Sequence, residues 1–551
     1  MPHHPRVLAL ALAALLLGCD DRGAPATTAT NATDAATNAT DITSKVDVVE
    51  LSVAEAEAGM AAGRFTSADL VDAYLARIAA VDDAGPTLNA VIALNPQARA
   101  DAEALDAERA AGTVRGAMHG IPVLVKDNID VAGMPTTAGS LALANHVPKD
   151  DAELVARLRA AGAVILGKTN LSEWANFRST NSISGWSSAG GQTRNPYVLD
   201  RNACGSSSGT GAAIAASLAT VGVGTETDGS ILCPSAVNSL VGFKPTVGLV
   251  SGDGIVPISA SQDTAGPMAR SVADAAALLE ALADVEVDLG AGRAPAASTA
   301  PATPGTDAPS AAAHEAGAAL PLAGKRFGLL RQAMGRHPGL DAATERAVER
   351  LRAAGAEVID VEMATWGQWG GHELTVLLYE FKDGLNRYLA EGGAPVANLE
   401  ALIAWNAANA DRAMPWFGQE LFEQAQAKGP LSDAEYVAAR DAARRLAGEE
   451  GLLRLLRDQR LDALIAPTTG PAWPIDPVLG DHFTSAGYGA AAVAGTPSLT
   501  VPMGDVHGLP VGLSLMAPRN GDVGLLALGA RVEAALPGSR RPPSFRPTIS
   551  P

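Results

Sequence analysis

The sequence predicts an α/β fold, in which one domain of about 500 residues is built on a large mixed β-sheet that helices cover on both faces. Segments with the apolar spacing of amphipathic helices alternate along the chain with short apolar runs typical of buried strands. The chain has 551 residues, of which 47% are hydrophobic, and this is ample for a large core. Since no repeat of solenoid length is present, a repeat architecture is not expected.

The elements follow from the hydrophobic pattern. Helices are expected at 67–81, 151–161 and 340–354, and strands at 121–126, 163–167, 326–330, 357–361 and 461–466. Ser52 and Glu55 have the spacing of a capping box, which indicates a helix that begins just after Ser52. The pattern continues on both sides of 290–320, a segment of Ala, Pro, Thr, Ser and Gly. This segment is therefore expected to be a low-complexity surface insertion rather than a domain boundary.

The N-terminus is typical of an export signal. Residues 7–17 form an apolar run that is too short to span a bilayer as a permanent helix. The run ends in Leu-Leu-Gly-Cys, residues 16–19, which resembles the bacterial lipobox, where the peptide is cut before the Cys and the Cys is lipidated. We therefore expect a lipoprotein signal peptide at 1–18 and a lipid on Cys19 that holds the exported protein on the periplasmic side of a bacterial membrane. An ordinary signal peptide is the alternative.

Composition limits the rest of the chain and its partners. Residues 19–46 are almost free of large apolar groups and are expected to form a flexible tether, which leaves 47–547 for the folded domain. The net charge of −19 disfavours nucleic acid and anionic membrane surfaces as partners. A link to a membrane is therefore expected only through the lipid at Cys19.

Lys126 ends the strand-like run 121–126, and among the lysines of the chain it is the one for which we expect this position. Ligand sites of α/β proteins gather at the carboxyl ends of strands. Burial there would lower the pKa of the lysine, so that its neutral amine could act as a general base. The alternative is an ion pair with Asp127 at the rim of the sheet.

Two serine-rich turns follow Lys126. Ser206 lies in the turn 204–209, before an Ala-rich run at 210–220 that is expected to be a helix whose N-terminus favours developing negative charge. Ser230 ends the run 221–230, where a small-residue strand leads into consecutive backbone amides suited to an oxyanion. The two serines are 24 residues apart. Either turn alone is equally typical of an ordinary Gly-rich turn.

The first turn also fits Gly-x-Ser-x-Gly, which would make Ser207 the nucleophile of an α/β-hydrolase-type esterase. Such a nucleophile elbow needs an apolar strand immediately before it. Residues 194–204 are loop-like, so the esterase is the less favoured reading.

Taken together, Lys126, Ser206 and Ser230 resemble the amidase signature family, and the resemblance covers most of the chain from about residue 46. In that family a lysine, a serine in a Gly-Ser-Ser turn and a second serine 24 residues later form a Ser-cisSer-Lys triad. The resemblance implies the amidase-signature fold, with Ser230 as nucleophile, Ser206 as the bridging cis serine and Lys126 as base. It also implies an oxyanion hole formed by the backbone amides of Thr227, Asp228, Gly229 and Ser230, and it implies neither a cofactor nor a metal.

Within the family the chain is most similar to the bacterial peptide amidases, through the runs 167–178, 182–186, 190–197 and 466–470. This similarity implies hydrolysis of carboxamides, above all the C-terminal amide of peptides, with release of ammonia through an acyl-enzyme on Ser230. The expected partner is therefore a small-molecule or peptide amide. The lipobox and the 290–320 insertion depart from the peptide amidase pattern, and a non-catalytic periplasmic binding lipoprotein is a further alternative.

Histidine and metal chemistry are not favoured. None of the nine His forms a His-x-x-x-His pair and no Cys-x-x-Cys is present. His119, just before the Lys126 strand, is expected to have a packing or capping role. Cys204 and Cys233 could pair in an exported protein, but two free buried thiols are the favoured expectation.

Overall fold

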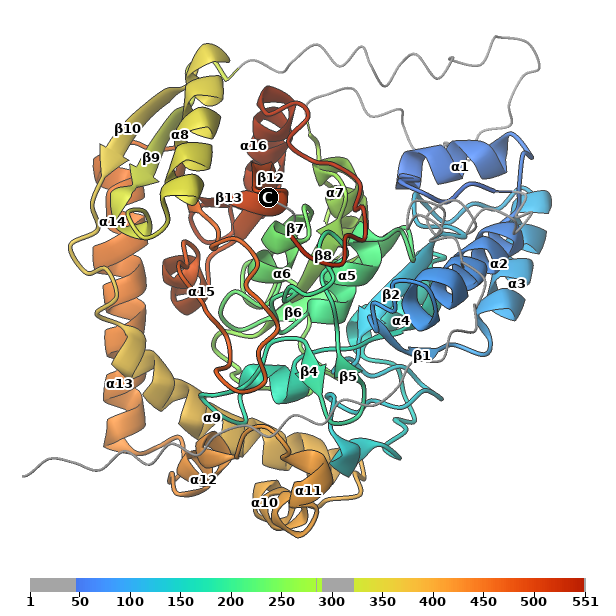
Figure 1. The fold of residues 1–551 in the computed structure, drawn as a ribbon, viewed down its shortest axis with the longest axis horizontal. Coiled ribbons are helices and arrows are strands. Elements are labelled where there is room, and N and C mark those ends of the chain that lie inside the picture. The colour runs from blue at the N-terminus through green and yellow to red at the C-terminus, as the bar shows by residue number, and fades with distance from the viewer. Residues whose placement is uncertain (1–45, 284, 290–321, 550–551) are drawn as a thin grey trace, which may run out of the picture. The chain divides into compact units, whose positions relative to one another are not determined.

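The centre of the fold is an 11-stranded mixed sheet with the strand order β1-β3-β2-β6-β8-β7-β12-β13-β11-β9-β10 (Figure 1). The computed structural model describes residues 46–283, 285–289 and 322–549. The predicted signal peptide, the predicted lipid on Cys19, nearly all of the predicted tether and all of the 290–320 insertion therefore lie outside the described residues. No helix within the described ranges is long and apolar enough to cross a membrane.

Two groups of parallel strands are joined by antiparallel ones. Strands β2, β3 and β6 are parallel to one another, as are β9, β10 and β11, while the remaining neighbours in the sheet are antiparallel. The strands of this sheet are β1 (Val91–Leu94), β2 (Pro122–Lys126), β3 (Val164–Thr169), β6 (Val221–Glu226), β7 (Val241–Lys244), β8 (Thr264–Ala269), β9 (Arg326–Leu330), β10 (Glu357–Val361), β11 (Ala463–Pro467), β12 (Ser498–Val506) and β13 (Leu509–Met516). A separate small sheet pairs β4 (Trp186–Ser187) with β5 (Gly191–Gln192).

Helices cover both faces of the sheet, as the sequence predicts. They are α1 (Val53–Ala61), α2 (Ser67–Ile78), α3 (Ala98–Ala110), α4 (Glu153–Ala160), α5 (Ser208–Ala215), α6 (Leu232–Val237), α7 (Val272–Ala283), α8 (Pro338–Ala353), α9 (Gly370–Glu391), α10 (Leu399–Ala408), α11 (Ala410–Ala413), α12 (Glu420–Gln426), α13 (Ala434–Arg444), α14 (Leu453–Asp458), α15 (Gly489–Ala494) and α16 (Asp522–Ala535). The capping box at Ser52 and Glu55 is formed at the start of α1. Strands β9 and β10 have the expected bounds, whereas α5 is shorter than expected because Ser217 adopts a left-handed φ of 57°.

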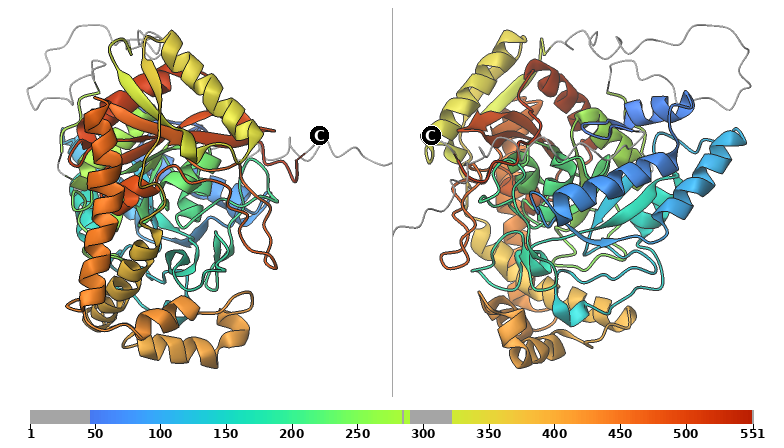
Figure 2. Two further views of the ribbon diagram at one scale, coloured as in Figure 1. Left: turned by 90° about the vertical axis from the view of Figure 1, so that its left-hand side faces the viewer. Right: turned by 45° about the vertical axis from the view of Figure 1, so that its right-hand side comes forward.

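A second hydrophobic core lies beside the main one and ties α9, α10 and α12 to loops from the first half of the chain. It contains Trp174 and Val256 from these loops together with Phe381 of α9 and Phe422 of α12. The Phe422 ring stacks on Phe381 at 5.2 Å and meets Trp174 edge-on at 5.7 Å. Helices α9 to α12, drawn in gold and orange, form a layer at one end of the described domain (Figure 2). The layer therefore fixes the loop that holds Val256.

Cys204 and Cys233 form a disulfide, with their Cα atoms 6.0 Å apart. The expectation of two free thiols is therefore wrong. It gave more weight to the packing of small side chains than to pairing between the two turns, whereas the backbone amide of Ser207 donates to the carbonyl of Ser230 at 3.2 Å. This contact holds the two serine turns side by side and brings the cysteines that flank them into disulfide range.

Thiol titration tests the bridge. Denatured, unreduced protein carrying Cys19→Ser is expected to contain no free thiol, and two free thiols would contradict the bridge. Because the bridge closes a sequence separation of 29 residues, the double variant Cys204→Ser/Cys233→Ser is expected to lose about 3 to 4 kcal/mol of stability in chemical unfolding. The Cys19→Ser protein without these two changes is the matched control.

Candidate active site

Lys126 and Ser206 meet at the carboxyl ends of the parallel strands β2 and β6. The Nζ of Lys126 lies 2.7 Å from Ser206 Oγ, 2.8 Å from Thr225 Oγ1 and 3.3 Å from the Thr225 carbonyl. Thr225 is near the end of β6, and Ser206 belongs to the turn before α5, where the Gly205–Ser206 peptide bond is cis. Both Lys126 and Ser206 are fully buried. Two of the three predicted triad residues are therefore in direct contact.

The surroundings of Lys126 favour its neutral form. Burial lowers the pKa of Lys126 to about 7, and the nearby carboxyls of Asp263 and Glu226 only partly oppose this effect. Within the described ranges no carboxylate lies at ion-pair distance from its Nζ, and its hydrogen-bond partners are oxygens of Ser206 and Thr225. A substantial neutral fraction near pH 7 gives a general base of suitable strength.

Position at a strand end does not by itself single out Lys126. Lys168 in β3 and Lys244 at the end of β7 are also fully buried. The expectation that Lys126 is the one lysine with such a position is therefore wrong. Lys168 Nζ lies 3.1 Å from Asp127 Oδ1, which also removes Asp127 as the partner of Lys126. Lys244 donates to the carbonyl of Pro245. What distinguishes Lys126 is its contact with the serine turn.

Ser230 lies in the turn between β6 and α6. Its side chain is 9% exposed, and its hydroxyl forms no hydrogen bond with any residue that the structure describes. Ser207, by contrast, is fully buried, donates through Oγ to the Thr225 carbonyl at 3.1 Å and accepts from the Thr225 amide at 3.2 Å. Ser207 therefore fixes the end of β6, while Ser230 has a hydroxyl free to react.

The turn 227–230 has a defined backbone geometry. The carboxylate of Glu226 accepts hydrogen bonds from the amides of Ile231 and Leu232 at 2.8 and 3.0 Å, which anchors the start of α6. The amides of Asp228 and Ser230 donate no hydrogen bond to another described residue. These two of the four predicted donors are therefore free to face an oxyanion, whereas the amide of Gly229 bonds to the Glu226 carboxylate.

Gly229 is required in this turn for two reasons. Its φ is +82°, and a methyl group on its Cα would overlap the Tyr488 ring. Gly229→Ala is therefore expected to displace the turn and to lower kcat/KM for amides by about 100-fold, with a loss of stability of about 1 to 3 kcal/mol. Steady-state kinetics and thermal unfolding measure the two effects. Gly112→Ala is the matched control, since Gly112 also has a positive φ, of +87°, but an added methyl would meet no atom within 4 Å and the residue does not line the cavity beside the site; equal kinetic losses in both variants would contradict the role of the turn.

Four carboxyl groups surround this turn, and the sequence predicts no role for any of their side chains. Asp263 accepts hydrogen bonds from Thr227 Oγ1 at 2.6 Å and from the amides of Ile258 and Ser259, and burial raises its pKa to about 6. Glu373 of α9 accepts from Gln262 at 3.0 Å. Glu226 and Asp228 lie in the turn sequence itself. The run Thr-Glu-Thr-Asp-Gly-Ser was the only sequence signal that could have indicated any of these groups.

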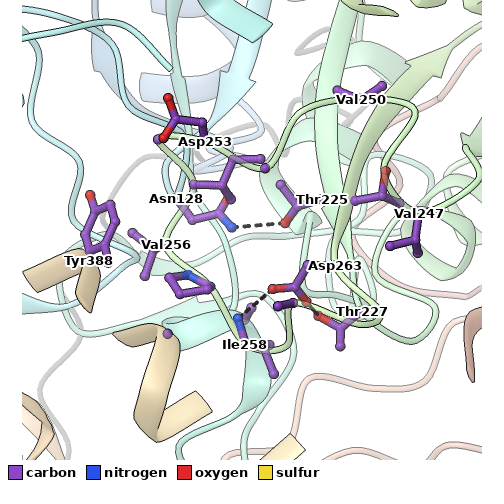
Figure 3. A pocket seen from close by; sticks show the side chains of 18 of the residues that line it. Asn128, Thr225, Thr227, Val247, Val250, Asp253, Val256, Ile258, Asp263 and Tyr388 are labelled. Carbon is purple, nitrogen blue, oxygen red and sulfur yellow. Dashed lines mark hydrogen bonds between the residues drawn. The ribbon is translucent and has the colours of Figure 1, made fainter. Parts of the chain in front are cut away.

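A cavity of about 420 Å³ lies against the end of β6 (Figure 3). Thr225, Thr227 and Asp263 line it together with the loop that carries Val256 and Ile258. Asn128 also lines the cavity, donates to Thr225 Oγ1 at 3.0 Å and has a buried Oδ1 without a hydrogen-bond partner among the described residues. The cavity therefore adjoins the residues that hold Lys126 and has polar groups on one wall and apolar groups on another.

His119 is a packed residue, as expected. Its ring is fully buried, with Nε2 3.0 Å from the Leu105 carbonyl and Nδ1 accepting from the Arg115 amide at 3.3 Å. Both ring nitrogens are thus used in local packing. In the part of the chain that the structure describes, no group of three His, Cys, Asp or Glu residues is arranged to hold a metal ion.

Comparison with known proteins gives long matches. The sequence model of a family described as Amidase matches residues 69–526. A probable amidase of Arabidopsis thaliana is 37% identical over 522 residues, which are 92% of this chain and 93% of the plant protein. One component of the glutamyl-tRNA(Gln) amidotransferase of Salinispora arenicola is 37% identical over 524 residues, covering 91% of this chain and 100% of that component.

Solved structures agree with the sequence matches. The native peptide amidase of Stenotrophomonas maltophilia is 53% identical with a TM-score of 0.81, and the match covers 90% of this chain and 98% of that one. A peptide amidase in complex with the competitive inhibitor chymostatin has the same identity and TM-score and is covered to 99%. These similarities extend over the whole sheet and the candidate site.

Proposed function

This chain belongs to the amidase family and is an amide hydrolase, and we propose that it releases ammonia from the C-terminal carboxamide of peptides through an acyl-enzyme on Ser230. The observation that carries the proposal is the buried contact of Lys126 with Ser206 beside a turn whose Ser230 hydroxyl is free. The 53% identity to a peptide amidase over 90% of the chain supports the choice of peptide amides as substrates.

In the proposed reaction the hydroxyl of Ser230 attacks the carboxamide carbon. Its proton passes to Ser206, which at the same time gives its own proton to the neutral amine of Lys126. The carbonyl oxygen becomes an oxyanion, which accepts hydrogen bonds from backbone amides of the turn 227–230. The electron pair of the carbonyl π bond thus moves to oxygen while one C–O bond forms.

Collapse of this intermediate breaks the C–N bond. The same relay runs in reverse, so that the proton on Lys126 returns through Ser206 to the departing nitrogen, and ammonia leaves. Water then repeats the attack on the ester of Ser230, and its proton follows the same path. The products are one peptide acid, one ammonia and the regenerated serine, with no change of oxidation state.

The cavity beside β6 suits the acyl part of such a substrate. A volume of about 420 Å³ is within the range of small-molecule sites, and it adjoins Thr227 of the proposed oxyanion hole. Its apolar wall at Val256 and Ile258 offers contact to a side chain. We assign it to the C-terminal residue of the peptide.

Ammonia release from a panel of amides tests the proposal. The panel contains peptide amides, free amino-acid amides and fatty-acid amides, and peptide amides are expected to give the highest kcat/KM. A strong preference for fatty-acid amides would overturn the substrate assignment, while hydrolysis of internal peptide bonds at a similar rate would overturn the restriction to the C-terminus.

We further propose that the protein is exported and held at a bacterial membrane by a lipid on Cys19. The Leu-Leu-Gly-Cys run supports this, and so does the Cys204–Cys233 disulfide, because such bridges persist in oxidising compartments such as the periplasm. In cell fractionation, the wild-type chain is expected with the membranes and the Cys19→Ser variant in the soluble fraction. Equal distribution of the two would contradict the anchor.

A further inference from the structure

Asp228 differs from the other carboxyl groups around the nucleophile turn. Glu226 accepts from two backbone amides, Asp263 from a threonine hydroxyl and two amides, and Glu373 from Gln262. The side chain of Asp228 is exposed and forms no hydrogen bond or ion pair with any residue that the structure describes. It is therefore a free acceptor two residues before Ser230.

The surroundings of Asp228 place its carboxyl in a recess. A methyl on Gly489 would lie 3.8 Å from Asp228 Oδ1 and 3.9 Å from the Trp369 ring, so these groups share one small space. The neighbouring Tyr488 packs against Gly229, and Tyr488 and Trp369 are both buried. Solvent reaches Asp228, yet protein surrounds it closely enough to raise the pKa of its carboxyl, first by desolvation and then through Glu373 and Glu226.

The ionisable groups that act on Asp228 are mainly carboxyls. Glu373 and Glu226 raise its pKa, and the buried Lys244 opposes them. When these carboxyls are ionised, an anion brought to Ser230 meets like charge in a space of reduced polarity, where repulsion is stronger than in water. A neutral group that donates hydrogen bonds meets an acceptor instead.

This contrast matches the difference between the two ends of the proposed reaction. A carboxamide presents two N–H donors, whereas the carboxylate product presents only acceptors and a negative charge. A donated hydrogen bond also favours the ionised form of Asp228. The substrate would thus be bound and the product expelled by one side chain.

We propose that the side chain of Asp228 accepts a hydrogen bond from the NH₂ of the C-terminal carboxamide and repels the carboxylate of the product. This inference rests on the proposed function and names the group that distinguishes amide from acid. The role is one of recognition, since the proton relay runs through Ser206 and Lys126.

Three ligands built on one peptide sequence test the assignment: the carboxamide, the methyl ester and the free acid. In Asp228→Asn, the ratio of kcat/KM for amide over ester is expected to fall by about 10-fold, because a charged acceptor is replaced by a weaker neutral one. The inhibition constant of the peptide acid is expected to fall by about 10-fold as well, because the like charge is removed. An unchanged ratio together with an unchanged inhibition constant would overturn the proposal.

Two further variants separate contact from charge. Glu373→Gln removes a nearby charge but keeps Asp228, so it is expected to tighten the peptide acid and to leave the amide-to-ester ratio within about 3-fold of wild type. Glu349→Gln, on the exposed face of α8, removes one charge that has no hydrogen-bond partner among the described residues and is expected to change neither quantity. If Glu373→Gln lowers the ratio as much as Asp228→Asn, the direct contact with the NH₂ is contradicted.

The unaltered enzyme gives a test that does not depend on the folding of a variant. The peptide acid is expected to inhibit at least about 10-fold more weakly than the same peptide ending in a neutral alcohol, and equal inhibition would overturn the proposal. Failure of the proposed function has a different signature, namely that the wild-type protein releases no ammonia from any peptide amide. Normal ammonia release with an unchanged Asp228→Asn variant contradicts this inference alone.

Discussion

Ser230→Ala is expected to abolish ammonia release from peptide amides, with a loss of kcat on the order of 10⁵-fold. Ser230 has the reactive position in the turn because its hydroxyl is partly exposed and unpaired among the described residues. Removal of one oxygen leaves the backbone of the turn in place, so the folded state and the binding of substrate should persist. Steady-state kinetics and thermal unfolding measure the two properties in the same preparation.

Ser207→Ala is the matched control for this variant. Ser207 has the same side chain, lies in the turn beside Ser230 and holds the backbone of Thr225 from a fully buried position. Its replacement is expected to lower the unfolding temperature and to reduce kcat by less than about 100-fold. Turnover that survives in Ser230→Ala but disappears in Ser207→Ala would instead favour the esterase-type arrangement.

The rate of the wild-type enzyme is expected to fall with decreasing pH through an apparent pKa near 7. Burial depresses the pKa of Lys126 to about 7, so its amine is mostly neutral above this pH and mostly protonated below it. Since only the neutral amine accepts a proton from Ser206, kcat/KM should rise with pH and then level off above about pH 8. Lys126→Met is expected to reduce kcat by about 10⁴-fold or more and to remove this pH dependence from any residual activity.

Asp263→Asn is a control for the assignment of Lys126, because the direction in which it should shift the pH profile is known. The Asp263 carboxylate raises the pKa of Lys126, so its neutralisation is expected to move the rise in kcat/KM to lower pH. The pKa of Asp263 itself is about 6, and the variant also shows whether the wild-type profile includes its ionisation. If kcat/KM of the wild-type enzyme stays constant from about pH 5 to 9 while the chemical step limits the rate, the role of Lys126 is contradicted.

Much of the fold could be predicted because local patterns and long-range packing agree. The apolar runs at β9 and β10 are bounded by turns and have the length of buried strands, so even their ends were predicted. The order of strands in the sheet could not be predicted, since it depends on how distant segments pair. The shortened α5 shows the same limit, because a single left-handed residue ends a run whose composition continues to favour a helix.

At the site, the positions of Lys126, Ser206 and Ser230 followed from a spacing that resembles a family. The partners of these residues did not follow from it. Lys168 is buried in an ion pair with Asp127. Composition alone cannot distinguish such a paired lysine from a catalytic one. The disulfide required the distance between two turns, and the carboxyl of Glu373 comes from a helix more than a hundred residues later in the chain.

The layer of helices α9 to α12 has a consequence for how such an enzyme can be altered. The groups proposed to make and break bonds lie between residues 126 and 230. Two residues that border the recess of Asp228 lie later in the chain: Trp369 immediately precedes α9, and Glu373 is in its first turn. Contacts to the substrate are therefore divided between the stretch that carries the reacting groups, which includes Asp228, and a helical layer later in the chain. Exchange of residues 369–426 between related amidases should alter one side of the substrate site while Lys126, Ser206, Ser230 and Asp228 stay unchanged.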